Sequence, residues 1–297
     1  MSKDQDNDSS SLSRIIQRYR ETLVEGGRDG QSEFEVRFGT IGPKTSRVQY
    51  QTVIKRILDY GFKNTADSYK LNCIPDGEQV RVEVNGLQAI EIYCDSDSFE
   101  RVMKNVSVTK KTPMQFHGLA IRREDFPEFG FRAALNLEVD MTQSPESRDI
   151  LSRWDKLKKK FRLLHRYRFT HPDVGFNIDL SIVKQAEAKT ISFSECGISN
   201  TEERYEIEIE ADNSLIQVYK SDDDILRDLR SLIKVVLSGL QSSNFPISYS
   251  QSKSVLNQYI RILWGKKYTQ AIGPRNFVGP SSVSLQRSNL VPQDPAL

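Results

Sequence analysis

Two segments of the chain place glutamate at every second position with apolar residues in between. They cover residues 32–38, which read Ser-Glu-Phe-Glu-Val-Arg-Phe, and residues 204–210, which read Arg-Tyr-Glu-Ile-Glu-Ile-Glu. Alternate side chains of a β-strand share a face, so the pattern predicts two strands with one charged and one apolar face each. Glutamates two residues apart on a strand lie about 7 Å from each other and repel by about 2 kcal/mol at an effective dielectric constant of about 20. We therefore expect compensation, from a divalent cation that takes oxygen ligands or from facing lysines and arginines.

The remaining pattern predicts helices towards both ends of the chain and strands between them. Apolar residues with helical spacing occur over 11–25, 46–60, 222–240 and 250–263. Further strand candidates are residues 69–74, 79–84, 89–94, 102–109, 131–138, 161–170, 176–183 and 203–210. So many antiparallel strands favour an α+β fold built on a closed antiparallel β-barrel of about eight strands with flanking helices, because closure removes unpaired edges. With its acidic faces turned inward, such a barrel is a polar tunnel suited to a charged ligand.

Composition divides the chain into three parts. Residues 1–10 are polar and predict a disordered N-terminus. Residues 11–265 are predicted to form the tunnel domain. Residues 266–297, with their Gly-Pro pairs, are typical of a linker or tail.

Charge and cysteine content narrow the function. The 297 residues carry a formal net charge of only +2, so a site for a polyanion must be a local cluster of cations. Three widely spaced cysteines predict no disulfide framework and a reducing compartment. No secretory signal and no long apolar run are evident, so we expect an intracellular, cytoplasmic protein with no membrane partner.

Basic residues recur on other predicted strands in positions that can face the acids. Arg162, Arg166 and Arg168 share one parity, and after a turn Asp179 and Ser181 share another face. Three further candidates, each on or at the end of a strand, are Arg81, Lys111 and Arg132. The alternative interpretation of any one of them is a solvated surface cation. As a set, they predict a cationic lining beside the carboxylates.

Cations around a chain of phosphates, with carboxylates that hold a metal ion, form the recurring arrangement for phosphoryl transfer. The sequence contains no G-x-x-x-x-G-K-[ST] loop and no Cys-x₅-Arg loop. A Walker-type nucleotidase and a cysteine phosphatase are thereby excluded.

The order of these motifs resembles a known family. The E-x-E-x-R strand at 33–37, the R-x-R strand followed by I-D-L-S-I-V-K, and Y-E-I-E-I-E at 205–210 resemble the triphosphate tunnel metalloenzymes. Within them, the chain is most similar to the metal-dependent RNA 5′-triphosphatases of fungal and large DNA virus capping enzymes, over residues 30–265. Residues 245–248 and 277–285 also resemble the viral enzymes, the latter as a connector to a guanylyltransferase domain.

The resemblance implies a role for each motif residue. The implied metal ligands are Glu33, Glu35, Glu208 and Glu210, with Glu206 helping to orient water. The other implied catalytic residues are Arg166, Arg168 and Asp179, with Ser181 in support. Phosphate contacts are implied for Arg37, Arg81, Lys111, Arg132, Arg162, Arg166 and Arg168. One position departs from the family: Leu164 stands where a third cation is common on the basic strand, and Arg162 is the candidate substitute.

The implied reaction is hydrolysis of the γ-phosphate of 5′-triphosphate RNA to 5′-diphosphate RNA, the first step of mRNA capping, with Mg²⁺ or Mn²⁺ as cofactor. Implied partners are the RNA substrate and guanylyltransferase and methyltransferase domains, in cis or in trans. The chain lacks the K-x-D-G motif of guanylyltransferases. By analogy with viral enzymes we expect a monomer, located in the cytoplasm, a virus factory or a virion.

Three alternatives remain open at this stage. The first keeps the architecture but changes the substrate to inorganic tripolyphosphate, a nucleoside triphosphate or thiamine triphosphate, or the reaction to cyclic AMP synthesis. The second is a barrel that binds polyphosphate or RNA ends without turnover. The third is a structural β-domain whose alternation only marks solvent-facing strands.

Overall fold

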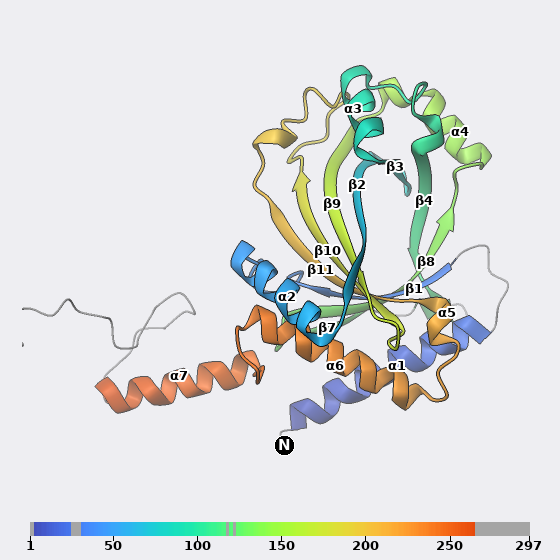
Figure 1. Cartoon of the computed structure of the whole chain (residues 1–297). Helices are drawn as coiled ribbons and strands as arrows, with labels where there is room; N and C mark the ends of the chain where they lie inside the picture. The colour runs from blue at the N-terminus through green and yellow to red at the C-terminus, as the bar shows by residue number, and fades with distance from the viewer. Residues whose placement is uncertain (1–2, 25–30, 117–118, 121–122, 265–297) are drawn as a thin grey trace, which may run out of the picture. The chain divides into compact units, whose positions relative to one another are not determined.

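The computed structural model describes residues 3–24, 31–116, 119–120 and 123–264, and Figure 1 shows their arrangement. The chain divides into two compact units, Met1–Ile247 and Ser248–Leu297. The second unit contributes one described helix, α7 (Tyr249–Trp264). The predicted linker or tail over residues 266–297 lies outside the described residues.

The first unit is built on a closed antiparallel barrel of eight strands. Its strand order is β1-β11-β10-β9-β2-β3-β4-β8, and β8 pairs back to β1 to close the ring. A ninth strand, β7 (Glu124–Phe126), pairs with β8. The barrel strands are β1 (Gln31–Phe38), β2 (Lys63–Pro75), β3 (Arg81–Asn85), β4 (Val106–Pro113), β8 (Phe131–Asp140), β9 (Lys159–Thr170), β10 (Phe176–Gln185) and β11 (Arg204–Ala211). The predicted α+β tunnel fold is confirmed.

Helices cover the outside of the barrel in two groups. Around one part of the wall lie α1 (Lys3–Val24), α2 (Arg47–Tyr60), α5 (Asn213–Ile216) and α6 (Asp222–Leu240), and around the opposite part lie α3 (Leu87–Ser96) and α4 (Pro145–Ser152) (Figure 1). Short elements complete the unit: strands β5 (Gln115–Phe116) and β6 (Leu119–Ala120), and 3-10 helices at Met103–Asn105, Trp154–Lys156 and Ile198–Asn200. No helix among the described ranges has an apolar stretch long enough to cross a membrane.

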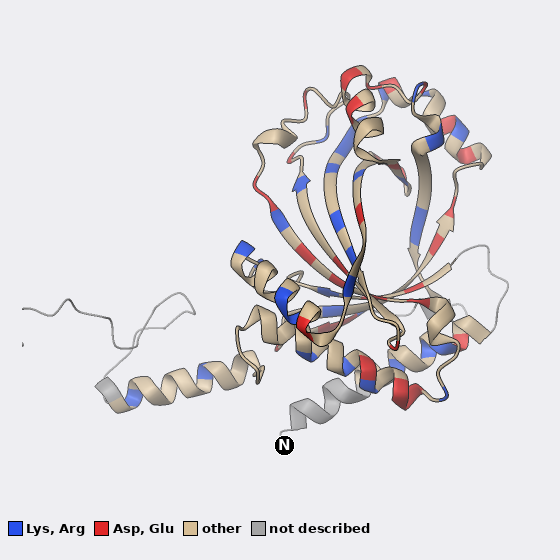
Figure 2. Ribbon diagram, in the orientation of Figure 1, with Lys and Arg blue, Asp and Glu red and all other residues tan. Residues whose placement is uncertain are grey.

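The hydrophobic cores lie between the helices and the outer faces of the strands, not inside the barrel. Phe34 and Val36 of β1 are fully buried against the group that contains α1 and α6. A second core joins α3 and α4 to the outer faces of β2, β3, β4 and β9. Burying the apolar faces outward leaves the charged faces to line the lumen, so charged residues, blue or red, alternate with tan ones along several strands (Figure 2).

The outer core depends on a close approach of α2 and α6 at Gly239. A Cβ atom at this glycine would lie 2.6 Å from Val53 Cγ2 and 2.7 Å from Val53 Cα. Alanine gains about 1 kcal/mol in helix propensity, but overpacking against the backbone of a neighbouring helix costs more. We expect Gly239→Ala to lower the free energy of unfolding in urea by about 2 kcal/mol. Lys234→Ala, at an exposed position of the same helix, serves as control, and an unchanged Gly239→Ala midpoint would contradict the packing argument.

The structure corrects several element predictions. The strand predicted over 89–94 is wrong: these residues form α3, because Ala89, Ile90 and Tyr93 bury one helical face. The strand predicted over 102–109 begins only at Val106, after a 3-10 turn. Residues 3–10, predicted to be disordered, belong to α1. The helix predicted over 250–263 is present as α7, but it lies in the second unit and not with the barrel.

Candidate active site

The two acidic rows predicted from the sequence lie on neighbouring strands. β1 and β11 pair antiparallel with Glu35 opposite Glu210 and Arg37 opposite Glu208. Because Phe34 and Val36 are buried on the outer face, Glu33, Glu35 and Arg37 project into the lumen. The β1–β11 pair thus brings one pair of like charges, Glu35 and Glu210, next to one pair of opposite charges, Arg37 and Glu208.

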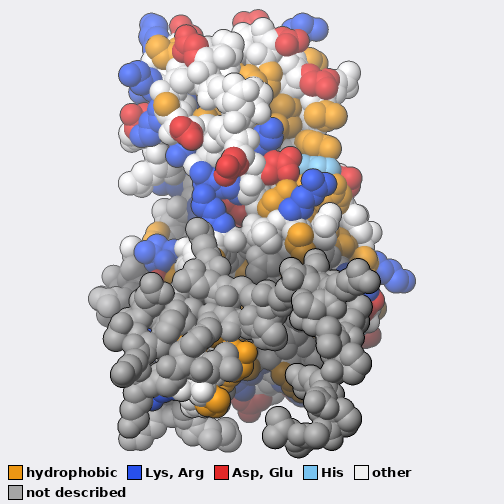
Figure 3. All heavy atoms as spheres, turned by 90° about the vertical axis from the view of Figure 1, so that its left-hand side faces the viewer, with side chains coloured by type: hydrophobic (Ala, Val, Ile, Leu, Met, Phe, Trp, Pro, Cys, Tyr) orange, Lys and Arg blue, Asp and Glu red, His pale blue; other side chains and the backbone are white. Residues whose placement is uncertain are grey.

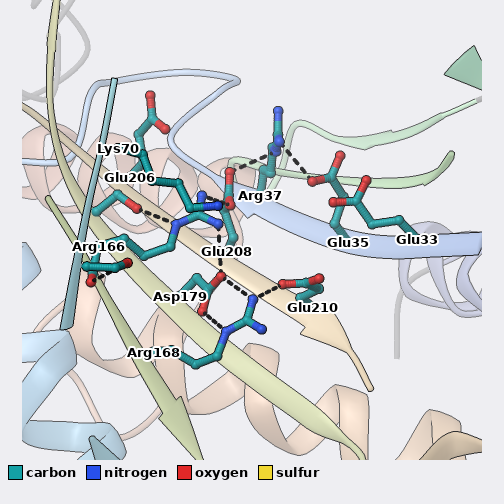
Figure 4. Close-up of polar contacts among 12 residues, drawn as sticks. Glu33, Glu35, Arg37, Lys70, Arg166, Arg168, Asp179, Glu206, Glu208 and Glu210 are labelled. Atoms are coloured by element: carbon teal, nitrogen blue, oxygen red, sulfur yellow. Dashed lines mark hydrogen bonds and ion pairs between the residues drawn. The ribbon is translucent and has the colours of Figure 1, made fainter. Parts of the chain in front are cut away.

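The basic row of β9 completes the same side of the lumen. In the β9–β10 pair Arg168 lies opposite Asp179 and Arg166 lies opposite Ser181. In the β10–β11 pair Asp179 lies opposite Glu208. Arginines and glutamates therefore flank a central strand that carries a carboxylate and a hydroxyl, and Figure 4 shows their side chains converging.

Asp179 anchors this arrangement. Its side chain is only 1% exposed and receives three guanidinium contacts. Arg168 binds it in a bidentate manner, with Nε 2.8 Å from Oδ1 and Nη2 2.7 Å from Oδ2. Arg166 donates from Nη1 to Oδ2 at 3.1 Å and from Nε to Ser181 Oγ at 3.1 Å. Such charge-assisted pairs fix both arginines in orientation.

Glu208 lies between two guanidinium groups. Arg37 Nε is 3.0 Å from its Oε1, and Arg166 Nη2 donates to its Oε2 at 3.0 Å (Figure 4). Burial alone would raise the pKa of this carboxyl group, but Arg37, Arg166 and other cations outweigh it and hold the pKa below its ordinary value. Glu208 is 8% exposed and therefore remains a buried, ionised carboxylate.

Glu33 and Glu35 share a lysine. Lys111 Nζ lies 2.5 Å from Glu33 Oε2 and 2.9 Å from Glu35 Oε1. Asn136 also donates to Glu35 Oε1 at 3.1 Å, and Arg37 Nη2 lies 2.9 Å from Glu35 Oε2. Glu35 is 4% exposed, and burial raises its pKa despite these cations. Glu33 Oε2 is buried and makes no hydrogen bond of ordinary geometry, so its ion pair with Lys111 leaves acceptor capacity unused.

Glu210 and Glu206 occupy the two ends of the β11 row. Glu210 contacts Arg168, and Glu206 contacts Arg162. Burial raises the pKa of Glu210 to about 7, with Arg168 opposing the shift. A cation that binds Glu210 near neutral pH must therefore displace a proton.

Four of the carboxylates form a donor set that suits a hard divalent cation. Glu33 and Glu35 on β1 face Glu208 and Glu210 on β11, and oxygen is the ligand atom that Mg²⁺ and Mn²⁺ prefer. In the described residues no group of three or more Asp, Glu, His or Cys side chains already stands in metal-ligand geometry. Lysine and arginine side chains occupy the space between the carboxylates instead. The spare acceptor at Glu33 and the all-oxygen chemistry fit such an ion once these ion pairs open.

The structure also places the remaining predicted residues. Arg162 points inward and pairs with Glu206, while Leu164 is buried on the same lumen-facing row. Arg81 donates from Nη2 to Glu138 Oε1 at 2.7 Å. Arg132 forms a bidentate pair with Asp125 of β7, with Nη2 3.0 Å from Oδ2, and lies opposite Arg37 in the β1–β8 pair. Its predicted phosphate contact stays a prediction.

Sequence reasoning missed four lumen residues. Lys70 and Glu83 lie 3.7 Å apart on β2 and β3, and Glu83 also contacts Arg81. Asn136 and Glu138 of β8 bind Glu35 and Arg81 respectively. Each of the four alternates with apolar neighbours in the sequence, so the same period of two could have found them.

Neither protein-family models nor curated protein sequences give a match to this chain. Solved structures do match this chain. The RNA triphosphatase domain of a trifunctional mimivirus mRNA capping enzyme superposes with a TM-score of 0.50 at 15% identity, over 80% of this chain and 99% of that one. A second crystal form of the mimivirus capping enzyme triphosphatase gives 0.50 at 14% identity, over 77% and 97%.

The chain has the fold of that triphosphatase domain. At this identity the likeness establishes the tunnel architecture alone, so the chemistry must be argued from the lumen. One end of the tunnel opens into a cavity of about 650 Å³, and the lumen residues that reach it are Arg37, Arg162, Glu206 and Glu208.

Proposed function

We propose that the barrel is a metal-dependent RNA 5′-triphosphatase, a hydrolase that removes the γ-phosphate of 5′-triphosphate RNA and leaves a 5′-diphosphate end. One observation carries the proposal: rows of carboxylates and rows of guanidinium groups face each other inside a closed barrel. Carboxylates are what a divalent cation needs, and guanidinium forks are what phosphates need. The tunnel brings carboxylates and guanidinium groups together at one site.

The arginines deep in the lumen are each paired with a carboxylate. Arg37, Arg166 and Arg168 bind carboxylates that are themselves buried. A buried pair of this kind gains little net stability, because desolvation offsets the attraction, but it keeps both groups ionised and oriented. When a triphosphate and a metal ion enter together, the arginines can take phosphate oxygens while the carboxylates keep a cation. A divalent cation offsets part of the negative charge that the triphosphate brings, and the arginines released from their carboxylates can offset more.

The proposed roles follow from position. Glu33, Glu35, Glu208 and Glu210 would hold Mg²⁺ or Mn²⁺, which would neutralise charge on the phosphate oxygens. Arg166 and Arg168, fixed by Asp179, would bind the oxygens of the transferred phosphate. Arg37, Arg81, Lys111 and Arg162 would contact the rest of the triphosphate. Glu206 stands at the cavity end of the row, and its Oε1, the oxygen not engaged by Arg162, would accept a proton from the attacking water.

Binding of the cation should be visible without turnover. We expect Mg²⁺ or Mn²⁺ at about 100 times its dissociation constant to add about 2.7 kcal/mol of stability, or about 5–10 °C in melting temperature. Glu33→Ala should abolish the shift, whereas Glu91→Ala, at an exposed glutamate of α3, should keep it. The measurement is thermal unfolding by fluorescence with increasing metal. An equal shift in wild type and Glu33→Ala would contradict the assignment of the metal ligands.

A substrate panel tests the proposed function. Phosphate release is measured from 5′-triphosphate RNA, from ATP and from inorganic tripolyphosphate under the same metal conditions. We expect the largest kcat/KM for the RNA. Cleavage of tripolyphosphate or ATP with no cleavage of RNA would keep the tunnel chemistry and reject the capping reaction. Binding of all three with no release would favour a non-catalytic barrel.

The capping context is part of the same proposal. The mimivirus neighbour is a domain of a trifunctional capping enzyme. A 5′-diphosphate RNA is the substrate that a guanylyltransferase requires. We therefore propose that guanylyltransferase and methyltransferase domains act after this one, in the same polypeptide or as separate chains.

A further inference from the structure

The cavity at the end of the tunnel is larger and differently lined than a triphosphate alone requires. Its volume of about 650 Å³ lies within the range of sites for whole small molecules. Its floor consists of lumen residues. Its walls are residues 38–40 and 44–46, which lead from β1 into α2, and residues 202–205, which lead into β11. In Figure 1 the starts of α2 and β11 both lie on the left-hand side of the barrel.

At this end of the barrel the start of β11 extends beyond the end of β1, which leaves an opening. The last paired residue of β1, Phe38, lies opposite Ile207. Residues 204–206 therefore continue past the end of β1 and remain paired only with β10. The backbone edge of residues 204–206 that is not paired with β1 faces the cavity.

The charge of the lumen changes sign towards this opening. On β1 the inward row runs from Glu33 and Glu35 to Arg37, and on β11 it runs from Glu208 and Glu206 to Arg204. An anionic chain that enters here meets arginines beside the carboxylates that also line the cavity. Figure 3, which views the molecule from this side, shows basic side chains beside acidic ones.

Two cations stand at the rim. Lys44 and Arg204 are exposed and line the cavity, and neither has an ion-pair partner within the described part of the chain. The arginines deeper in the lumen are all held by carboxylates. Acidic side chains are also present: Glu202 lines the cavity, and Glu203 accepts a hydrogen bond from Tyr205 Oη at 2.8 Å. Lys44 and Arg204 are thus the cations available to a ligand without breaking an existing pair.

The same two cations belong to a second hollow. It has a volume of about 570 Å³ and is polar, with Asn200, Thr201 and Gln185 among its lining residues. Lys44, Arg204, Gln185 and Glu202 line both spaces, so the two adjoin. The path from the lumen therefore continues over the surface past Lys44 and Arg204.

An aromatic residue on the outer face of β11 also lines the cavity. Tyr205 is half-buried and packs on Tyr50 of α2, with ring centroids 5.0 Å apart. A base that stacks on an aromatic side chain gains about 1–3 kcal/mol without sequence preference. Free cations beside a fixed ring, leading away from a triphosphate site, suit a single-stranded nucleic acid.

We propose that the cavity and the adjoining hollow receive the first nucleotides of the RNA, with Lys44 and Arg204 contacting backbone phosphates and Tyr205 supporting a base. This inference rests on the proposed function and adds to it the residues that select RNA ends over short polyphosphates. Inorganic tripolyphosphate ends inside the lumen and makes none of these contacts.

The test compares two substrates in one variant. Lys44→Ala/Arg204→Ala is assayed on a 5′-triphosphate RNA of about ten nucleotides and on tripolyphosphate, at several salt concentrations. We expect kcat/KM for RNA to fall at least about 10-fold, mainly through KM, while tripolyphosphate hydrolysis stays within about twofold. Because each phosphate contact in single strands contributes about 0.7 to the salt slope, losing two should reduce that slope by about 1.4.

Arg101→Ala/Lys104→Ala is the matched control. It removes the same two charges from exposed positions that line neither hollow, and it should behave like wild type on both substrates. Equal losses on RNA and on tripolyphosphate, or an unchanged salt slope for RNA, would overturn the inference and leave the proposed function standing. Failure of the wild type to cleave RNA at all, with tripolyphosphate cleaved, would overturn both.

Discussion

Glu208→Ala is expected to lower γ-phosphate release at least about 100-fold. Glu208 touches both arginines that approach from β1 and β9, and it lies beside Glu210 on the row proposed to hold the metal ion. Removing it takes away a buried carboxylate whose pKa is held below its ordinary value by Arg37 and Arg166. Glu35→Ala should have a comparable effect, because Glu35 stands opposite Glu210 across the β1–β11 pair.

Stability must be separated from chemistry in this experiment. Without Glu208, Arg37 and Arg166 each lose one of their acceptors in a buried place, which destabilises the fold. Glu208→Gln keeps the size and one acceptor oxygen, so it should unfold cooperatively near the wild-type temperature and still be inactive. Glu91→Ala, which changes an exposed glutamate, should keep full activity. Activity near the wild-type level in Glu208→Gln would contradict the proposed role.

Arg168→Ala is expected to lower kcat about 100-fold, the second large effect. Arg168 contacts both oxygens of Asp179 as well as Glu210, so its guanidinium is held at the line where the acidic and basic rows meet. Arg168→Lys should restore only part of the rate, because an ammonium group cannot reproduce the bidentate geometry. Steady-state kinetics on 5′-triphosphate RNA measure both.

Arg153→Ala is the matched control for this series. Arg153 is also an ion-paired arginine, with Nη2 2.8 Å from Glu78 Oε1, but it lies on the outer surface next to α4. It should leave kcat unchanged, since surface ion pairs contribute little. Full recovery of activity in Arg168→Lys would show that Arg168 supplies charge alone and would contradict the positioning role inferred from its contacts.

The alternation of charged and apolar residues predicted the barrel, because burial of the apolar face decides where the charged face points. Phe34 and Val36 must be buried outside, and this forces Glu33 and Glu35 into the lumen. The arginine strand and the Asp179 strand, predicted to follow one another after a turn, pair so that Arg168 meets Asp179. The helices α2 and α6 were found from their apolar faces.

Other features could be identified only from the three-dimensional structure. Helix α3 was misread because Ile90, Ile92 and Cys94 also fit a period of two over a short stretch, and only burial against β2 and β3 distinguishes the two patterns. The partner of Arg132 depends on β7, a three-residue strand that supplies Asp125. The pairing of Lys111 with Glu33 and Glu35 depends on the closure of β8 on β1, a contact about 76 residues apart in sequence between Lys111 and Glu35.

The most direct test of the central claim is release of labelled phosphate from RNA that carries ³²P at the γ position. It is measured with Mg²⁺, with Mn²⁺ and with EDTA, in wild type and in Glu208→Gln. We expect metal-dependent release by the wild type that leaves a 5′-diphosphate end, and none with EDTA or in the variant. Release that persists with EDTA, or in Glu208→Gln, would contradict a metal-dependent triphosphatase in this tunnel.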